Sequence, residues 1–171
     1  RNVEERRGAG NELVRINQES SQKALQNTAA RAGALSLGDS GAAFAACIAS
    51  LDEVAAMLTK SSAFAARPTL ERVNAARANI YALQGLEKDA VLEVDQARID
   101  ELVARAAKLT EQLQPEVDAI VKGVKLPSAI RAKSEEFGAL YAQARAACAE
   151  TMAMAQANED QKAFVLAESA G

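Results

Sequence analysis

The chain contains very few residues that force a helix to stop. Proline occurs at three of the 171 positions, namely Pro68, Pro115 and Pro127, and glycine at nine. Proline in a helix interior removes a backbone hydrogen bond and clashes with the preceding turn, so the long stretches without proline are open to helix formation. Aromatic residues make up only 4% of the chain, and much of its apolar content is alanine, the strongest helix former. Because alternating runs of β-branched and aromatic residues are also absent, the sequence predicts an all-α fold.

Four long segments predict helices over 3–35, 42–84, 89–122 and 128–169, and in the last three hydrophobic residues recur at spacings of three and four. The small and polar residues at 38–41 predict a turn, and Pro68 predicts a kink or short break at 66–69. Short connections place consecutive helices antiparallel. The expected architecture is therefore an up-down-up-down four-helix bundle, in a single domain over 1–171.

Gly85 leaves two alternatives for the second helix. A glycine followed by the apolar Leu86 is typical of a helix stop. A glycine inside a helix costs only about 1 kcal/mol, however, so a helix that runs straight through Gly85 also fits the pattern.

Both ends of the chain read as parts of helices, so we expect a fragment of a longer protein. No apolar run approaches the length of about 20 residues that spans a bilayer. Contact with a membrane is therefore expected only through flanking segments outside this chain.

Several function classes are disfavoured by composition. The formal net charge is −3 and no block of lysine and arginine occurs, which argues against nucleic-acid binding. The chain has no histidine, the usual general base and zinc ligand. Glycine-rich phosphate loops are absent as well. The sequence thus predicts a protein that is not an enzyme and that holds neither a cofactor nor a metal.

The two cysteines, Cys47 and Cys148, lie on apolar stripes and match no metal-binding spacing. We interpret them as small buried hydrophobic residues. In the predicted bundle their heights differ by about 20 Å of helical rise, too far for a disulfide.

The first predicted helix has polar residues where a core stripe should be apolar, most clearly over 17–23. One interpretation is a face that lies in water. The other is a seam against a second subunit or a polar ligand, since buried polar groups need hydrogen-bond partners.

Five residues are candidates for ligand binding. In the predicted bundle Asn27, Arg31 and Arg131 converge at the end opposite the termini, where guanidinium groups could bind a carboxylate or another oxyanion. Arg77 flanks an apolar stripe, and Tyr141 with Arg145 forms an i, i+4 pair that could line a pocket between helices. The alternative is that the arginines lie on the surface over alanine and that Tyr141 packs in the core.

The layout and composition resemble the four-helix-bundle periplasmic sensor domains of bacterial methyl-accepting chemoreceptors and sensor kinases. The stretch 16–27 is loosely similar to the first-helix motif of the nitrate-sensing and pilus-chemoreceptor type. Ile16 and Asn17 match it, whereas Ser20, Lys23 and Ala24 replace a glycine, an arginine and a methionine. The resemblance implies a homodimer through the first helix and a periplasmic location at the inner membrane.

The leading hypothesis is an extracytoplasmic sensor domain that binds a small polar or anionic solute between helices: an organic acid, an amino acid or an inorganic anion. The rival is a non-catalytic helical scaffold that packs against partner helices. A polar-lined pocket favours the sensor, and a continuous dry seam favours the scaffold.

Overall fold

The computed structural model describes residues 14–16, 28–123 and 125–157, which contain five longer α-helices, one π-helix and short connecting loops. Residues 14–16 are helical. The longer elements are α2 (Thr28–Leu35), the π-helix η1 (Ser36–Ser40), α3 (Gly41–Thr59), α4 (Ala66–Leu92), α5 (Gln96–Val121) and α6 (Ser128–Ala157). No strand occurs in these residues, so the all-α prediction is confirmed. The predicted helical segments at 3–13, 17–27 and 158–169 lie outside the described residues.

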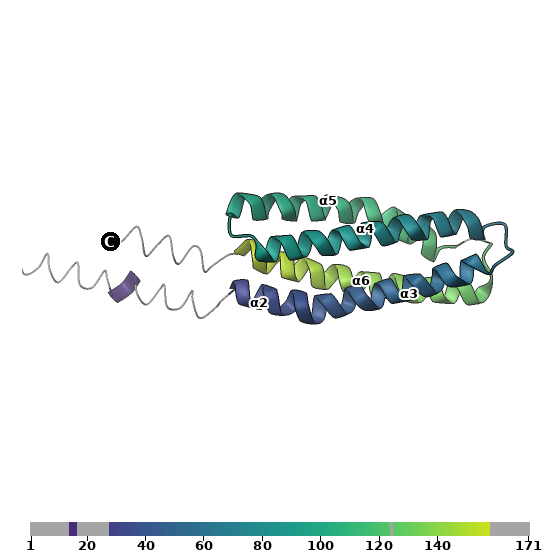
Figure 1. Ribbon diagram of the computed structural model, residues 1–171, viewed down its shortest axis with the longest axis horizontal. Helices are drawn as coiled ribbons and strands as arrows, with labels where there is room; N and C mark the ends of the chain where they lie inside the picture. The colour runs from purple at the N-terminus through teal and green to yellow at the C-terminus, as the bar shows by residue number, and fades with distance from the viewer. Residues whose placement is uncertain (1–13, 17–27, 124, 158–171) are drawn as a thin grey trace, which may run out of the picture.

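The helices form four rods that lie side by side (Figure 1). The first rod is α2, η1 and α3 in one line, and α4, α5 and α6 are the others. Around the bundle α3 packs against α4 and α6, and α5 packs against α4 and α6. The loop at 60–65 and residues 122–123 and 125–127 lie at one end. The start of α2, the end of α6 and the loop at 93–95 lie at the other.

The predicted turn at 38–41 is wrong, because the chain continues as helix through η1 into α3. The inward-facing residues explain this. Thr28, Ala32, Ser36, Ser40 and Phe44 are all buried and are spaced by four. An α-helix turns 100° per residue, so such a spacing drifts about 40° per step away from the core. The wider π-helix takes up this drift and keeps the row facing inward.

The predicted helix over 42–84 breaks at a different place from the one expected, and at Gly85 the structure decides between the two alternatives. The break lies at 60–65 rather than 66–69, and Pro68 stands in the first turn of α4, where a proline is tolerated. Gly85 does not end the helix, which runs on to Leu92 as the alternative interpretation expected. The buried Glu87 and Ala90 continue the inward face beyond Gly85.

The third helix begins at Gln96 rather than near 89, because Asp95 caps it. The Asp95 carboxylate accepts a hydrogen bond from the Arg98 N–H at 3.0 Å. Such a cap satisfies one of the unpaired donors of the first helical turn. The end of the third helix, Val121, and the start of the fourth, Ser128, agree with the predicted bounds to within one residue.

Pro115 lies inside α5 and is exposed, so it offers a simple test of this helix. Pro115→Ala should raise the free energy of unfolding by about 1–2 kcal/mol, because alanine restores a helical hydrogen bond at a surface position. Urea denaturation of the two proteins measures the difference. The control is Pro68→Ala in the first turn of α4, which should change stability by less than about 0.5 kcal/mol. Equal effects at the two sites would contradict the assigned helix bounds.

The first rod, Thr28–Thr59, is by length and composition apolar enough to cross a membrane. The sequence scan missed it because the predicted turn divided it. In the bundle its inward-facing apolar side chains, among them Phe44, Cys47 and Leu51, are fully buried and belong to one core with α4, α5 and α6, whereas Leu37 is exposed. Of its most apolar 18-residue window, 44% is buried within the bundle, so packing in the core accounts for part of the apolar character of this rod.

Candidate functional site

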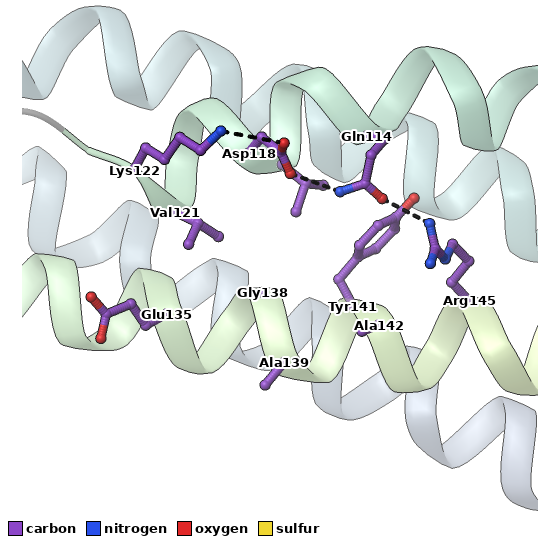
Figure 2. Close-up of a pocket in the computed structure, with 11 residues that line it drawn as sticks. Gln114, Asp118, Val121, Lys122, Glu135, Gly138, Ala139, Tyr141, Ala142 and Arg145 are labelled. Carbon is purple, nitrogen blue, oxygen red and sulfur yellow. Dashed lines mark hydrogen bonds and ion pairs between the residues drawn. The ribbon is translucent and has the colours of Figure 1, made fainter.

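A cavity of about 330 Å³ opens between α5 and α6 (Figure 2). Helix α5 contributes polar side chains to it, and α6 contributes small residues together with Tyr141 and Arg145. The lining residues are Gln114, Val117, Asp118, Val121, Lys122, Glu135, Gly138, Ala139, Tyr141, Ala142 and Arg145.

Gly138 brings the two helices close together at this cavity. A Cβ atom at this position would lie 2.7 Å from the Val121 Cγ2 atom, closer than real Cβ contacts. Any larger residue at 138 would therefore push α5 and α6 apart or displace Val121. The width of the cavity thus depends on this glycine.

Tyr141 is the most unusual residue of the cavity. Its side chain is only 2% exposed and its ring packs against Phe137, with ring centroids 6.4 Å apart. Figure 2 shows the ring reaching from α6 toward Gln114 of α5. The buried hydroxyl has no hydrogen-bond partner among the described residues. Because buried polar groups are normally paired, this hydroxyl is a candidate for binding a ligand.

The Tyr141 hydroxyl stays protonated over the physiological pH range. Burial raises its pKa to about 12, while the nearby Arg145 guanidinium acts in the opposite direction. A protonated phenol donates one hydrogen bond. Tyr141 is therefore a neutral donor beside a cation.

The polar residues around Tyr141 form a chain of contacts. Arg145 Nη1 donates to Gln114 Oε1 at 2.9 Å, and Gln114 Nε2 donates to Asp118 Oδ1 at 2.8 Å. Lys122 Nζ lies 3.6 Å from Asp118 Oδ2. The carboxylate of Asp118 is thus occupied by neighbours, whereas the other N–H groups of Arg145 have no partner within the described residues. Glu135 also lines the cavity, but it lies six residues before Tyr141 on α6. Next to Tyr141 the free hydrogen-bonding groups are the phenol and the guanidinium, both donors, which suits an anionic or carbonyl-bearing ligand.

The predicted meeting of Asn27, Arg31 and Arg131 does not occur. Arg31 lies 28 residues before the end of α3. At the rise of a helix it is therefore about 42 Å from the end of the bundle where the loop between α3 and α4 lies. Arg131 is exposed and lies in the first turn of α6, at that same end. The prediction failed because it placed a turn at 38–41 and so reversed the direction of the chain there. Asn27 lies outside the described residues.

Arg31 and Arg77 occupy different surroundings from Tyr141. Arg31 is exposed and borders a separate shallow pocket with Asp39 and Glu150. Arg77 Nη2 forms an ion pair with Asp52 Oδ1 at 2.7 Å, which links α4 to α3. Of the predicted binding residues that the structure describes, only Tyr141 lies in the cavity. Its predicted neighbour Arg145 lies there too.

Sequence reasoning missed the residues that α5 contributes, Gln114 and Asp118. They are four apart and therefore share a face of α5, which was the available signal. Their position opposite Tyr141 depends on the packing of α5 against α6, which local spacing does not reveal.

A second buried polar cluster joins η1, α4 and α6. Glu87 on α4 is fully buried, and its Oε2 accepts a hydrogen bond from the Ser40 hydroxyl of η1. Its Oε1 has no partner among the described residues. The Cys148 thiol of α6 lies beside the same carboxylate. In the part of the chain that the structure describes, no group of three or more histidine, cysteine or acidic residues could hold a metal ion.

The two cysteines are free and buried, so their thiols should make stability depend on alkaline pH. Burial raises the pKa of Cys47 to about 12, and burial together with Glu87 raises the pKa of Cys148 further. In the unfolded chain a thiol ionises near pH 8.5, so above that pH the unfolded state loses protons that the folded state keeps. The free energy of unfolding should thus fall as pH rises from about 9 to 12, by roughly 1 kcal/mol per pH unit per thiol.

Urea denaturation at pH 7.5, 9, 10 and 11 measures this dependence. Cys47→Ala removes one thiol, so its slope above pH 9 should be clearly smaller than that of the wild type. An unchanged slope in this variant would show that the Cys47 thiol is not the titrating group.

Comparisons of this chain with known protein families, with curated proteins and with solved structures found no match.

Proposed function

We propose that this chain is the ligand-sensing domain of a membrane receptor of the chemoreceptor type, and that it binds a small polar or anionic solute between α5 and α6. The observation that carries the proposal is the Tyr141 hydroxyl, which is buried in a cavity beside Arg145 and Gln114 and has no partner in the described part of the chain. A bound solute with an acceptor oxygen would satisfy this hydroxyl.

The character of the cavity favours a sensor over a scaffold. A helical scaffold would bury a continuous dry seam between its helices. The α5–α6 interface instead has polar and charged side chains around an open volume of about 330 Å³. Pockets for small molecules typically combine an apolar wall with a few polar groups that orient the ligand.

The remaining parts of the proposal come from the resemblance in layout and composition. The domain lies on the extracytoplasmic side of the inner membrane, is joined to it by segments that flank this chain, and forms a homodimer through its first helix. Ligand binding signals through a small shift of one helix against its neighbours, since packed helices slide or rotate as rigid elements.

A thermal-shift screen of the purified domain tests the proposal. The compounds are short carboxylic acids, amino acids and inorganic anions, including nitrate. A ligand present at 100 times its Kd adds about 2.7 kcal/mol of stability, so a true ligand should give a saturable rise in Tm. Arg145→Gln should reduce that rise, and Arg67→Gln, which changes an exposed arginine of α4, should leave it intact. If no compound shifts Tm and ultracentrifugation finds only a monomer, the scaffold becomes the better description.

Tyr141→Phe separates a binding role from a structural role for the hydroxyl. Because the hydroxyl has no partner among the described residues, its removal should leave the free energy of unfolding unchanged or raise it by about 1 kcal/mol. The same change should weaken ligand binding about tenfold, the loss of one good hydrogen bond. A variant that is destabilised by more than 1 kcal/mol would mean that the hydroxyl is paired within the fold.

A further inference from the structure

A second and larger cavity, of about 550 Å³, adjoins the first along the α5–α6 interface. The two cavities share Ala142 and Arg145 in their linings. Arg145 therefore stands at the junction, with the polar residues of the first cavity on one side and the second cavity on the other.

The second cavity is lined mainly by apolar side chains. Leu83 of α4, Val103 of α5 and Met152 of α6 contribute to it, together with six alanines. The remaining lining residues are Thr110, Arg145, Cys148 and Gln156. On α6 the alanines follow at spacings of three and four, as residues on one helix face do: Ala142, Ala146, Ala149 and Ala153. Because alanine side chains are short, α5 and α6 leave a groove along this face. From Arg145 to Gln156 it extends about 16 Å at the rise of an α-helix.

The junction offers hydrogen-bond donors to an anion. One N–H group of Arg145 is used by Gln114, and the others have no partner within the described residues. The Tyr141 hydroxyl, 2% exposed and unpartnered, lines the first cavity beside Arg145. A guanidinium group binds a carboxylate through two parallel hydrogen bonds, and a phenol adds a third donor. Two acids line the first cavity. Asp118 is already bonded to Gln114 and close to Lys122, and Glu135 lies six residues before Tyr141 on α6.

We infer that the two cavities together form one site for an amphipathic carboxylate. Its carboxylate group binds Arg145 and the Tyr141 hydroxyl, and its hydrocarbon tail lies in the alanine-lined groove toward Gln156. Burial of the tail removes apolar surface of both the ligand and the groove from water. This inference rests on the proposed function and specifies the class of its ligand.

The test is a calorimetric titration of the domain with straight-chain carboxylates of increasing length, from acetate through butanoate and hexanoate to octanoate, below their micellar concentrations. Each added methylene should lower Kd about threefold until the groove is filled. Octanol carries the tail without the charge and should bind at least tenfold more weakly than octanoate. Arg145→Gln should remove that difference.

Two alanine variants locate the tail. Ala107→Leu fills the groove from α5 and should weaken octanoate binding at least tenfold, with little effect on acetate or succinate. Ala104→Leu is the matched control, because Ala104 is an exposed residue of the same helix that lies outside both cavities. Both variants should keep the helical circular-dichroism spectrum of the wild type.

The outcomes distinguish this inference from the proposed function. Binding of succinate or acetate with no gain from chain length would overturn the amphipathic ligand and leave the sensor proposal standing. If affinity rises with chain length but octanol binds as tightly as octanoate, Arg145 and Tyr141 do not bind the carboxylate. If no carboxylate binds while another anion raises Tm, the site takes a different ligand class, and the absence of any binding overturns both proposals.

Discussion

Phe137→Ala should lower the free energy of unfolding by about 3–5 kcal/mol, the usual cost of truncating a fully buried phenylalanine. Phe137 has no exposed surface, and its ring contacts Tyr141 on the next turn of α6. Truncation removes buried apolar area and leaves a cavity that rigid neighbouring helices fill only in part. Urea denaturation monitored by circular dichroism measures the loss.

Phe64→Ala is the control for this change, because Phe64 is 97% exposed in the loop between α3 and α4. It should alter stability by less than about 0.5 kcal/mol. If Phe137→Ala cost no more than Phe64→Ala, Phe137 would not lie in the core, and the placement of Tyr141 beside it would also be wrong.

Glu87→Gln should have a large effect in the opposite direction and raise the free energy of unfolding by about 1–3 kcal/mol. Glu87 is fully buried, and only one of its oxygens has a partner among the described residues. Glutamine has nearly the same shape and keeps an acceptor for the Ser40 hydroxyl. Glutamine cannot ionise, so it avoids the cost that a buried carboxylate incurs on ionisation when no described cation lies beside it.

Glu71→Gln serves as the matched control on the same helix, since the Glu71 side chain is exposed and forms only a long surface contact with Arg67. It should change stability by less than about 0.5 kcal/mol. A loss of stability in Glu87→Gln would show that both oxygens of Glu87 are satisfied in the folded protein, and that the cluster with Ser40 and Cys148 stabilises the bundle.

The helical class of this chain follows from local properties, and most helix ends do not. Alanine content and the spacing of apolar residues are sufficient to predict all-α structure, and Pro127 with Ser128 marks the start of α6 correctly. The glycines at 38, 41 and 85 suggested stops that do not exist, because glycine permits a turn without requiring one. What keeps the chain helical there is the packing of Ser40 and Glu87 inside the bundle, a contact between residues 47 apart in sequence.

The candidate site, too, was predictable from local sequence only in part. The pair Tyr141 and Arg145 was predictable, because residues four apart share a face of one helix. The partners on α5 and the groove toward Gln156 arise only where two helices pack together. The proposed convergence of Arg31 and Arg131 failed for a related reason, since a single misplaced turn at 38–41 moved Arg31 to the wrong end of the bundle.

The central claim is that a ligand binds at Tyr141, and the two tyrosines of the chain allow a direct measurement. Fluorotyrosine incorporation gives one fluorine NMR signal for the buried Tyr141 and one for Tyr81, which is 52% exposed on α4. A Tyr81→Phe variant assigns the two signals. On titration with a carboxylate that raises Tm, the Tyr141 signal should shift and saturate at the same concentration as the thermal effect, while the Tyr81 signal stays in place. A ligand that raises Tm without moving the Tyr141 signal would bind elsewhere and contradict the claim.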